Sequence, residues 1–485
     1  MQQNYAMLFP FEKVRAGSRI LIYGAGAAGQ ECLRQMLLTG YAEVVGFLDR
    51  NADKISNLVV PVYRPEKLQE LDYDVVIVAF QKDAENSKIC QYIQRLGVPP
   101  EKIIDGLPRK VVECSIWSKA HDEESNHVSR AYEAASEEKF PVAFYVASNI
   151  GDAIFCKSVV DAFVKLSPSC SVDLYAPNAE AFLPTIYYGE SYLHGIFEGN
   201  RAVFQREASH YRMALDVSNL ALEHLDLSGC EAEYKALHHA LHEIQEWLKV
   251  HSIPSSLTGF VTAARAVYLG QNCYTWRNCG GALPIHDMSV HLCLDESYRE
   301  FFDNLHFGRY ITLNYASGNG SKREDYQAKQ WSFEYYPHLV QQLKKEFPSI
   351  DVVQLGTADA EKIPGADHYI LGKNLAFVEH VLCHSLLHID IEGGLVHLAT
   401  QFGTKCLVLF GPTRDDFFGY PQNINLKAGA CHGCFGIYPD FRVCARGLKV
   451  PACMSAITPE MVMEAARKYL ESIGGAKKNQ RGESS

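Results

Sequence analysis

The sequence lacks any apolar run close to the roughly 18 residues that a membrane-spanning helix requires. Its first residues, MQQNYAMLFPFEKVRAG, also lack the basic start, long apolar core and small-residue cleavage site of a signal peptide. We therefore expect a cytoplasmic protein without a transmembrane segment.

Positive charge is scarce as well. The 485 residues hold 46 Lys and Arg against 57 Asp and Glu, which gives a net charge of −11 and a pI near 6.0. A nucleic-acid-binding protein normally presents a basic surface to the phosphate backbone, so we expect no nucleic-acid partner. Any anionic ligand must instead be met by local groups.

Cysteine is plentiful, but most of the 15 cysteines form no pattern. They are scattered singly through apolar segments, as in proteins whose cysteines stay reduced. Four others form a group that begins with C-x-x-C spacing: Cys431, Cys434, Cys444 and Cys453. Four thiolates in a loop-rich segment suit a tetrahedral zinc or iron ion and leave no open position for substrate, so we predict a structural metal ion. Unliganded, reduced cysteines are the alternative.

The length predicts about three domains, and strands alternate with helices throughout. This alternation indicates parallel, doubly wound sheets and an α/β fold of three Rossmann-like units in series. The predicted divisions are an N-terminal accessory unit (1–112), a helical linker (113–140), a second unit (141–304), a third unit with the four-cysteine loop (305–475) and a disordered tail (476–485).

A glycine motif follows the first long strand. Gly24, Gly26 and Gly29 fit the pattern GxGxxG between a strand and a helix, and Asp49 ends the next strand. These are the positions of a dinucleotide's pyrophosphate and ribose contacts, so they mark a candidate nucleotide site. The alternative is a sheet in which the glycines serve only tight packing.

The segment IDIEGGLVHLATQFGTKCLVLFGPT, residues 389–413, is the most informative in the chain. A strand runs into Glu392, Gly393 and Gly394, a helix follows, and His397 lies one turn into it. The glycines let a ligand approach the backbone closely, and the start of the helix directs unpaired N–H groups at that ligand. With a carboxylate beside it for ribose hydroxyls, this predicts a nucleoside-diphosphate pocket.

Two further motifs are weaker when taken singly. Asp152 lies at a helix start, as a general base or only as a helix cap. Ser317 and Gly318 begin a glycine-rich turn that precedes Lys329; together they suit a diphosphate, or form a surface loop with a solvated lysine.

Together these motifs resemble glycosyltransferase family 9, the heptosyltransferases of bacterial surface glycans, over residues 141 to about 472. The matching words are IGD, AKQW, GKNLAFVEHVL, EGGLVHLA, LFGPT and the cysteine group ending in CMSAITPEMV. The resemblance implies a GT-B fold, in which two Rossmann-like units face each other across an interdomain cleft. The segment with IYGAGAAG and VVGFLDR resembles Rossmann-like domains fused to nucleotide-sugar-modifying enzymes.

The resemblance also implies roles. Asp152 matches the catalytic base, and Lys329 the lysine that neutralises the leaving diphosphate. The implied donor-binding residues are Glu392, Gly393, Gly394, His397, Thr413 and, more weakly, Glu361. The chain departs from the family at two places: the family usually has Asp-Ser/Thr-Gly at 392–394, and an arginine shortly before Gly151 is missing.

We therefore expect an inverting glycosyltransferase that moves a heptose or related sugar from a nucleoside-diphosphate donor, with ADP-heptose favoured, and that needs no catalytic metal. The acceptor hydroxyl belongs to a surface glycan, a lipopolysaccharide core or a protein, and a homo-oligomer is compatible with the sequence. A non-catalytic nucleotide-binding scaffold is one alternative. A nucleotide-sugar oxidoreductase or epimerase that uses the N-terminal unit is the other.

Overall fold

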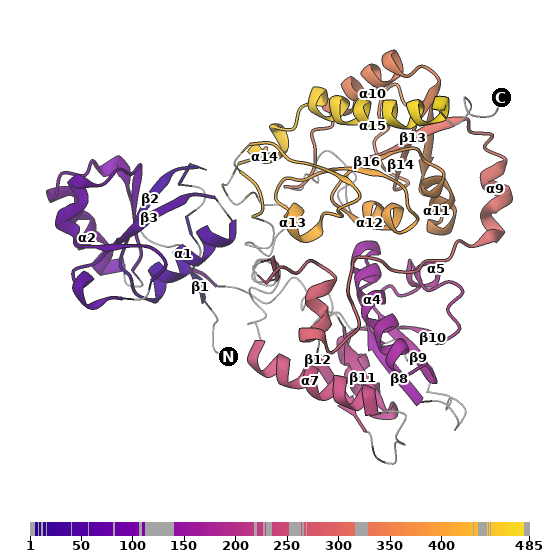
Figure 1. Ribbon diagram of the computed structural model, residues 1–485, viewed down its shortest axis with the longest axis horizontal. Coiled ribbons are helices and arrows are strands. Elements are labelled where there is room, and N and C mark those ends of the chain that lie inside the picture. The colour runs from indigo at the N-terminus through magenta and orange to yellow at the C-terminus, as the bar shows by residue number, and fades with distance from the viewer. Residues whose placement is uncertain are drawn as a thin grey trace.

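The computed structural model consists of three α/β units, seen in Figure 1 as indigo, magenta and orange-to-yellow ribbons. It describes residues 5–479 except 8, 11–12, 16, 40, 57, 81–82, 106–108, 112–139, 218–220, 227, 229–234, 252–262, 264–265, 268, 316–327, 430, 435–443, 445 and 447. The predicted helical linker therefore lies outside the described residues.

The first unit contains a five-stranded parallel sheet in the order β4-β3-β2-β5-β6. Apart from Arg19 at the start of β2, its central strands are apolar, because helices cover both faces. Ile20 and Ile22 pack toward α1, whereas Leu21 and Tyr23 pack toward α2. The elements are β1 (Tyr5–Met7), β2 (Arg19–Tyr23), α1 (Ala27–Thr39), β3 (Glu43–Leu48), η1 (Ala52–Lys54), β4 (Val62–Tyr63), η2 (Pro65–Glu70), β5 (Val75–Val78), α2 (Asp83–Arg95), η3 (Pro100–Lys102), β6 (Ile103–Ile104) and β7 (Arg109–Val111), which pairs with β1.

The second unit contains a sheet in the order β10-β9-β8-β11-β12, parallel except for the hairpin of β11 and β12. Helix α4 follows the central strand β8, and ten of its 17 residues are buried. The elements are β8 (Phe140–Tyr145), α4 (Ile150–Leu166), β9 (Cys170–Ala176), α5 (Leu183–Ile186), β10 (Leu193–Glu198), α6 (Arg201–Glu207), η4 (Ala208–His210), β11 (Met213–Asp216), β12 (Ala221–Leu225), α7 (Lys235–His251), η7 (Thr275–Gly281), η8 (Glu296–Tyr298) and α9 (Arg299–Asp303).

The third unit contains a six-stranded parallel sheet in the order β15-β14-β13-β16-β17-β18. Helices α10 and α15 pack on one face, and α11 and α12 on the face toward the second unit. The elements are β13 (Arg309–Asn314), α10 (Tyr335–Glu346), β14 (Ile350–Gly356), β15 (His368–Leu371), α11 (Leu375–Cys383), β16 (His388–Ile391), α12 (Gly394–Gln401), β17 (Cys406–Leu409), α13 (Asp415–Phe418), β18 (Ile424–Leu426), α14 (Ala452–Ser455) and α15 (Pro459–Asn479).

One hydrophobic core joins the second and third units. It runs from Phe155 on α4 through Tyr274 to Val396 on α12 and Tyr420. The segment after η7 also crosses to the third unit, where the backbone N–H of Val290 donates to the side chain of Gln401. The predicted α/β class, with three Rossmann-like units of which the last two face each other as in GT-B, is confirmed.

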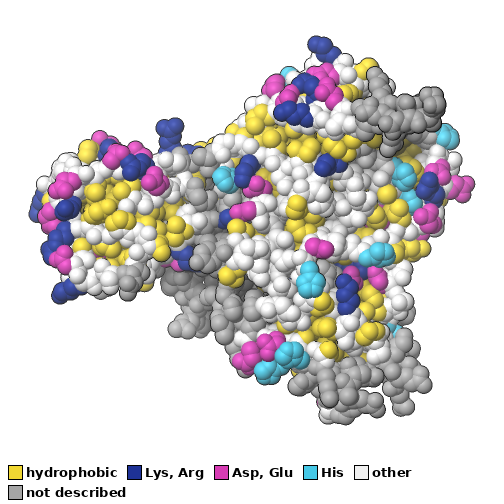
Figure 2. All heavy atoms as spheres, viewed as in Figure 1, with side chains coloured by type: hydrophobic (Ala, Val, Ile, Leu, Met, Phe, Trp, Pro, Cys, Tyr) yellow, Lys and Arg dark blue, Asp and Glu magenta, His cyan; other side chains and the backbone are white. Residues whose placement is uncertain are grey.

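Two differences from the expected divisions concern element ends. Strand β8 already begins at Phe140, and α15 continues to Asn479, into the stretch expected to form a disordered tail. In the described part of the chain, no helix combines the length and the apolar character that crossing a membrane would take. On the face in Figure 2, acidic and basic side chains are interspersed, and no continuous basic patch is visible among the coloured residues.

Candidate active site

Two helix starts meet where the second and third units touch. Helix α4 begins at Ile150 after β8, and α12 begins at Gly394 after β16, each beyond the carboxyl end of a central strand (Figure 1). A Cβ on Gly394 would lie 2.8 Å from the Cβ of Ile150, and one on Gly151 would lie 2.9 Å from Cδ2 of His397. Only glycine at both positions lets the two helices approach this closely.

This meeting point concentrates partial positive charge. The first N–H groups of a helix have no intrahelical acceptor, and neither N-cap residue, Asn149 nor Gly393, caps its helix with a side chain. Both helix dipoles therefore direct their positive ends at one place. The carboxyl edge of a parallel sheet is also where ligands of α/β proteins bind, so the geometry suits an anion such as a diphosphate.

Asp152 lies half-buried in the first turn of α4. Burial raises the pKa of its carboxyl group above the ordinary value. The nearby positive charges of Arg277, His397 and Lys329 oppose that rise, and the charge of Glu392 adds to it. A carboxylate with a raised pKa beside an anion site can accept a proton from a hydroxyl group, as a general base does.

Glu392 connects Lys329 and His397. Its Oε1 lies 3.1 Å from Nε2 of His397 and its Oε2 lies 3.7 Å from Nζ of Lys329. Burial by itself would raise the pKa of Glu392, but the charge of Lys329 and the hydrogen bond of His397 outweigh it and lower that pKa. The carboxylate is therefore ionised at neutral pH. The structure thus brings together Asp152, Lys329, Glu392, Gly393, Gly394 and His397, as predicted.

A buried chain of hydrogen bonds holds His397 in place, and the sequence did not reveal it. Nδ1 of His397 lies 2.9 Å from the hydroxyl of Tyr420, which lies 2.6 Å from the hydroxyl of Tyr274. Nε2 of Gln401 donates to both tyrosines, at 3.2 and 3.3 Å. Since Tyr274 belongs to the second unit, this chain couples the two units at the site. No motif distinguishes these tyrosines from ordinary core residues.

Arg277, in η7, is another residue that the sequence analysis missed. Its guanidinium lies 4.6 Å from the ring centre of Trp276 and 5.6 Å from that of Phe155. The same segment has left-handed backbone at Cys279, with φ of 52°, and at Gly280, with φ of 72°. The sequence TWRNCGG contains a turn signal in its two glycines, but nothing in it indicates where the turn lies in the fold.

The remaining predicted donor residues are placed less closely. Thr413 is buried in the turn after β17, which neighbours β16 in the sheet. Glu361 lies in the loop after β14, and its carbonyl accepts a hydrogen bond from Gln354. It is not among the charged groups that chiefly shift the pKa of Asp152 or Glu392. Ser317 and Gly318 lie outside the described residues.

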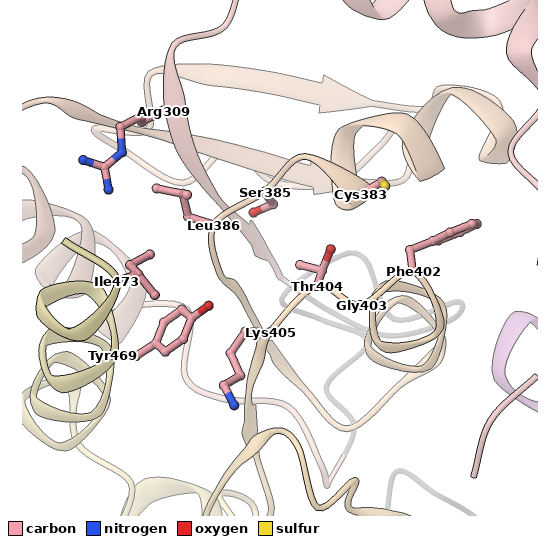
Figure 3. A pocket seen from close by; sticks show the side chains of 10 residues that line it. All are labelled: Arg309, Cys383, Ser385, Leu386, Phe402, Gly403, Thr404, Lys405, Tyr469 and Ile473. Carbon is pink, nitrogen blue, oxygen red and sulfur yellow. The ribbon is translucent and has the colours of Figure 1, made fainter. Parts of the chain in front are cut away.

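A pocket of about 310 Å³ lies at the opposite edge of the third sheet (Figure 3). Arg309 starts β13, and Leu386 and Lys405 lie just before β16 and β17, so the pocket is at the amino ends of these strands. Tyr469 and Ile473 of α15 close its other side. It is remote from Glu392, which follows the carboxyl end of β16, and takes no part in the candidate site.

The glycine motif of the first unit forms a closed turn. Gly24 has φ of 103°, and a Cβ on Gly29 would lie 1.9 Å from the carbonyl oxygen of Gly24. Above Gly26 there is open space. Asp49 Oδ2 accepts a hydrogen bond from the N–H of Ala25 at 3.1 Å, so the structure brings all four predicted residues together.

The four cysteines lie close enough to influence one another. A hydrogen bond from Cys453 and the charge of Arg446 lower the pKa of Cys431 to about 6, although burial opposes this. The hydrogen bond with Cys431 and burial raise the pKa of Cys453, and the charges of Cys434 and Cys444 add to that rise. The donor chemistry fits zinc or iron, but among the described residues no three His, Cys, Asp or Glu side chains are arranged to hold a metal ion.

Comparison with known proteins gives matches of two kinds. A family model described as "C2185-like, N-terminal" matches residues 16–104, which lie in the first unit. None of the curated proteins matches the chain. Solved structures of family 9 glycosyltransferases and heptosyltransferases, in contrast, are similar to part of the chain.

ADP-heptose lps heptosyltransferase II of E. coli is 14% identical and covers 69% of this chain and 99% of its own, with a TM-score of 0.42. A family 9 glycosyl transferase from Veillonella parvula is 12% identical and covers 70% and 99%, with a TM-score of 0.43. The iron-containing dodecameric glycosyltransferase TibC from enterotoxigenic E. coli is 13% identical and covers 69% and 77%, with a TM-score of 0.44. At these identities and scores, no residue role passes to this chain from them.

Proposed function

We propose that the protein is an inverting glycosyltransferase that moves a sugar from a nucleoside-diphosphate donor to a hydroxyl group. The observation that carries this proposal is the contact of the α4 and α12 helix starts, with Asp152 on one side and Lys329 and Glu392 on the other. An anion-binding centre and a carboxylate of raised pKa then lie on opposite units, as a two-substrate transfer requires.

The donor diphosphate binds at the start of α12, against the N–H groups after Gly393. Asp152 takes the proton of the acceptor hydroxyl as its oxygen attacks the anomeric carbon and the bond to the diphosphate breaks. The two helix starts and Lys329 stabilise the negative charge that grows on the leaving diphosphate. This arrangement needs no catalytic metal ion. Because attack and departure occur on opposite faces of the sugar, the configuration inverts.

The sugar is a heptose or a related sugar, with ADP-heptose as the favoured donor. The acceptor is a hydroxyl of a surface glycan, a lipopolysaccharide core or a protein. Glu392 is one methylene longer than the aspartate expected there, and it reaches Lys329, so the donor must compete with Glu392 for that lysine. The pairing of Glu392 with Lys329 is also the feature that would explain a non-catalytic, nucleotide-binding scaffold.

The test uses the full chain with a panel of nucleotide sugars that includes ADP-heptose. We expect one of these nucleotide sugars to raise the melting temperature of the protein. We also expect its nucleoside diphosphate to be released faster when an acceptor is supplied. Stabilisation without release of nucleoside diphosphate, with or without acceptor, would support the scaffold instead. Bound nicotinamide, seen by absorbance in the purified protein, would support the oxidoreductase.

We further propose that Cys431, Cys434, Cys444 and Cys453 bind a structural zinc or iron ion. The effect of Cys431, Cys434 and Cys444 on the pKa of Cys453 supports it, because it places the four thiols near one another. Elemental analysis of the purified chain should find about one metal ion per chain, lost in Cys434→Ser and retained in Cys90→Ser. A metal-free, stably folded chain would contradict this.

We propose, lastly, that the glycine turn of the first unit binds a nucleotide or sugar nucleotide. The open space above Gly26 and the carboxylate of Asp49 support it. The expected divisions of the chain and its assembly as a homo-oligomer stay predictions.

A further inference from the structure

Arg277 has no role in the transfer described so far, although it approaches the site from an unexpected element. It lies in η7, between the two units, and not in the loop before α4 where the family resemblance expects an arginine. Its charge is the strongest of the positive charges that act on Asp152. A guanidinium therefore reaches the start of α4 from a segment far along the chain.

The guanidinium is held rigidly. It lies against the rings of Trp276 and Phe155, and one of its terminal nitrogens donates to the carbonyl of Cys273. The left-handed backbone at Cys279 and Gly280 fixes the turn that follows it. A side chain fixed in this way loses little entropy when it binds an anion.

The guanidinium also has unused donor capacity. Its Nε is buried and has no hydrogen-bond acceptor among the described residues. A buried N–H of a charged group without an acceptor is costly, and an anionic ligand at this position would remove that cost. Carboxylates and phosphates match the planar donor set of arginine in shape and charge.

Two anions are conceivable on this side of the site, Asp152 itself and the donor diphosphate. Within the described part of the chain no hydrogen bond joins Asp152 to Arg277, and burial has a larger effect on the pKa of Asp152 than the charge of Arg277 has. Lys329, the lysine at the donor side, lies 3.7 Å from Glu392, so part of its charge is already balanced within the chain. Lys329 alone therefore does not neutralise a diphosphate at the centre where the two helix starts meet, and a second cation can contribute there.

We infer that Arg277 binds the diphosphate of the donor from the side of the second unit, opposite Lys329. This inference rests on the proposed function and names a further residue for the same site. It implies that the diphosphate is held by both units at once, so that leaving-group stabilisation depends on their contact.

The experiment measures binding of ADP, UDP, GDP and inorganic pyrophosphate to the full chain by titration calorimetry. Arg277→Gln should weaken the tightest of these by about 10- to 100-fold, and Arg277→Lys should weaken it less, because charge remains but the planar donor set is lost. The matched control is Arg299→Gln on α9. The guanidinium of Arg299 pairs with Asp303 on the surface, so this variant should bind the probes as tightly as the wild type does. The affinity of Arg277→Gln should also depend less on salt concentration.

Melting curves show whether the three variants are folded. If Arg277→Gln is not folded, the test uses Arg277→Lys alone. Wild-type affinity in both Arg277 variants would overturn the inference and leave the proposed function standing. The inference would equally be overturned if the variants changed only the KM of the acceptor. If the wild type bound none of the four probes, the proposed function would fall together with the inference.

Discussion

At the scale of single residues, the pKa of Asp152 gives the most direct prediction. Burial raises this pKa above its ordinary value of 3.8, so the carboxyl group loses its proton at a higher pH than a solvent-exposed aspartate. Transfer should therefore decline as the pH falls and Asp152 becomes protonated, and it should do so at a higher pH than a solvent-exposed aspartate would give. Arg277→Gln removes the positive charge that lowers the pKa of Asp152 the most, so the decline should shift to higher pH.

Asp152→Asn tests the same role without a change of pH. The amide cannot accept the proton, so kcat should fall about 10²- to 10⁴-fold while the affinity for nucleoside diphosphate stays near that of the wild type. Steady-state kinetics and calorimetry measure the two quantities. A turnover within tenfold of wild type, with binding intact, would remove Asp152 as the base.

Glu379 on α11 makes a prediction about stability. Both of its carboxylate oxygens are buried without a hydrogen-bond partner in the described residues, and burial, with a smaller contribution from Asp295, raises its pKa from 4.5 to about 9. Between these two values the unfolded chain releases the proton and the folded chain keeps it. The free energy of unfolding therefore falls as pH rises, by at most about 1.4 kcal/mol per pH unit.

Glu379→Gln removes this titration and keeps the shape of the side chain. The variant should gain stability relative to the wild type as pH rises from 5 to 9, and urea unfolding at pH 5, 7 and 9 measures the gain. The control is Glu300→Gln, an exposed carboxylate on α9. If the wild type and Glu379→Gln lost stability with pH at the same rate, the carboxyl would be ionised, or paired, in the folded state.

Sequence reasoning at the residue scale found the groups that belong to local motifs. Asp152 and Glu392 were predicted because each stands beside a glycine at a strand-to-helix junction, and His397 because it lies one turn into the helix that follows Gly394. Arg277 and Tyr420 were missed, because their roles come from contacts between segments far apart in the chain. Such contacts depend on tertiary packing, which leaves no local pattern.

At the scale of elements, the approach of α4 to α12 rests on single glycines. A methyl group on Gly394 would lie 2.8 Å from the Cβ of Ile150 and 3.2 Å from the backbone nitrogen of Gly151. On Gly393 it would meet only the carbonyl oxygen of Ile391, at 3.8 Å, in extended backbone. The adjacent glycines therefore form a matched pair.

Gly394→Ala should force the helix starts apart, destabilise the protein by about 1–3 kcal/mol and weaken nucleoside-diphosphate binding. Gly393→Ala should leave both quantities close to wild type. Urea unfolding and calorimetry of the two variants give the comparison. Equal behaviour of the two alanine variants would show that α4 and α12 do not touch in solution as they do here.

Element types were predictable here because glycines and polar turns separate the segments of the third unit. The helix expected after Glu392, Gly393 and Gly394 is α12, Gly394–Gln401, and the strand expected before them is β16, His388–Ile391. The segment of η7 was not predictable, since left-handed backbone at a cysteine contradicts ordinary propensity. Tertiary contacts impose that conformation.

At the scale of the whole molecule, the units are joined unequally. The core of the second unit is continuous with that of the third, whereas the core of the first unit meets the third only through the partly buried Cys431 and Cys434 among the described residues. The sequence indicated three units of similar kind, but it did not indicate which pair shares a core. That depends on the tertiary contact between α4 and α12.

This inequality predicts how the protein unfolds. The first unit should unfold in a transition of its own, while the second and third units should unfold together, because neither can lose its partner without exposing Phe155, Val396 and Tyr420. A nucleoside diphosphate at about 100 times its Kd for the site at the α4 and α12 helix starts should stabilise the joint transition by about 2.7 kcal/mol, separately from any stabilisation that its binding at the glycine turn gives the first unit. Scanning calorimetry with and without ligand measures both. A single transition that shifts as a whole would mean that the four-cysteine contact couples the first unit as firmly as the shared core couples the others.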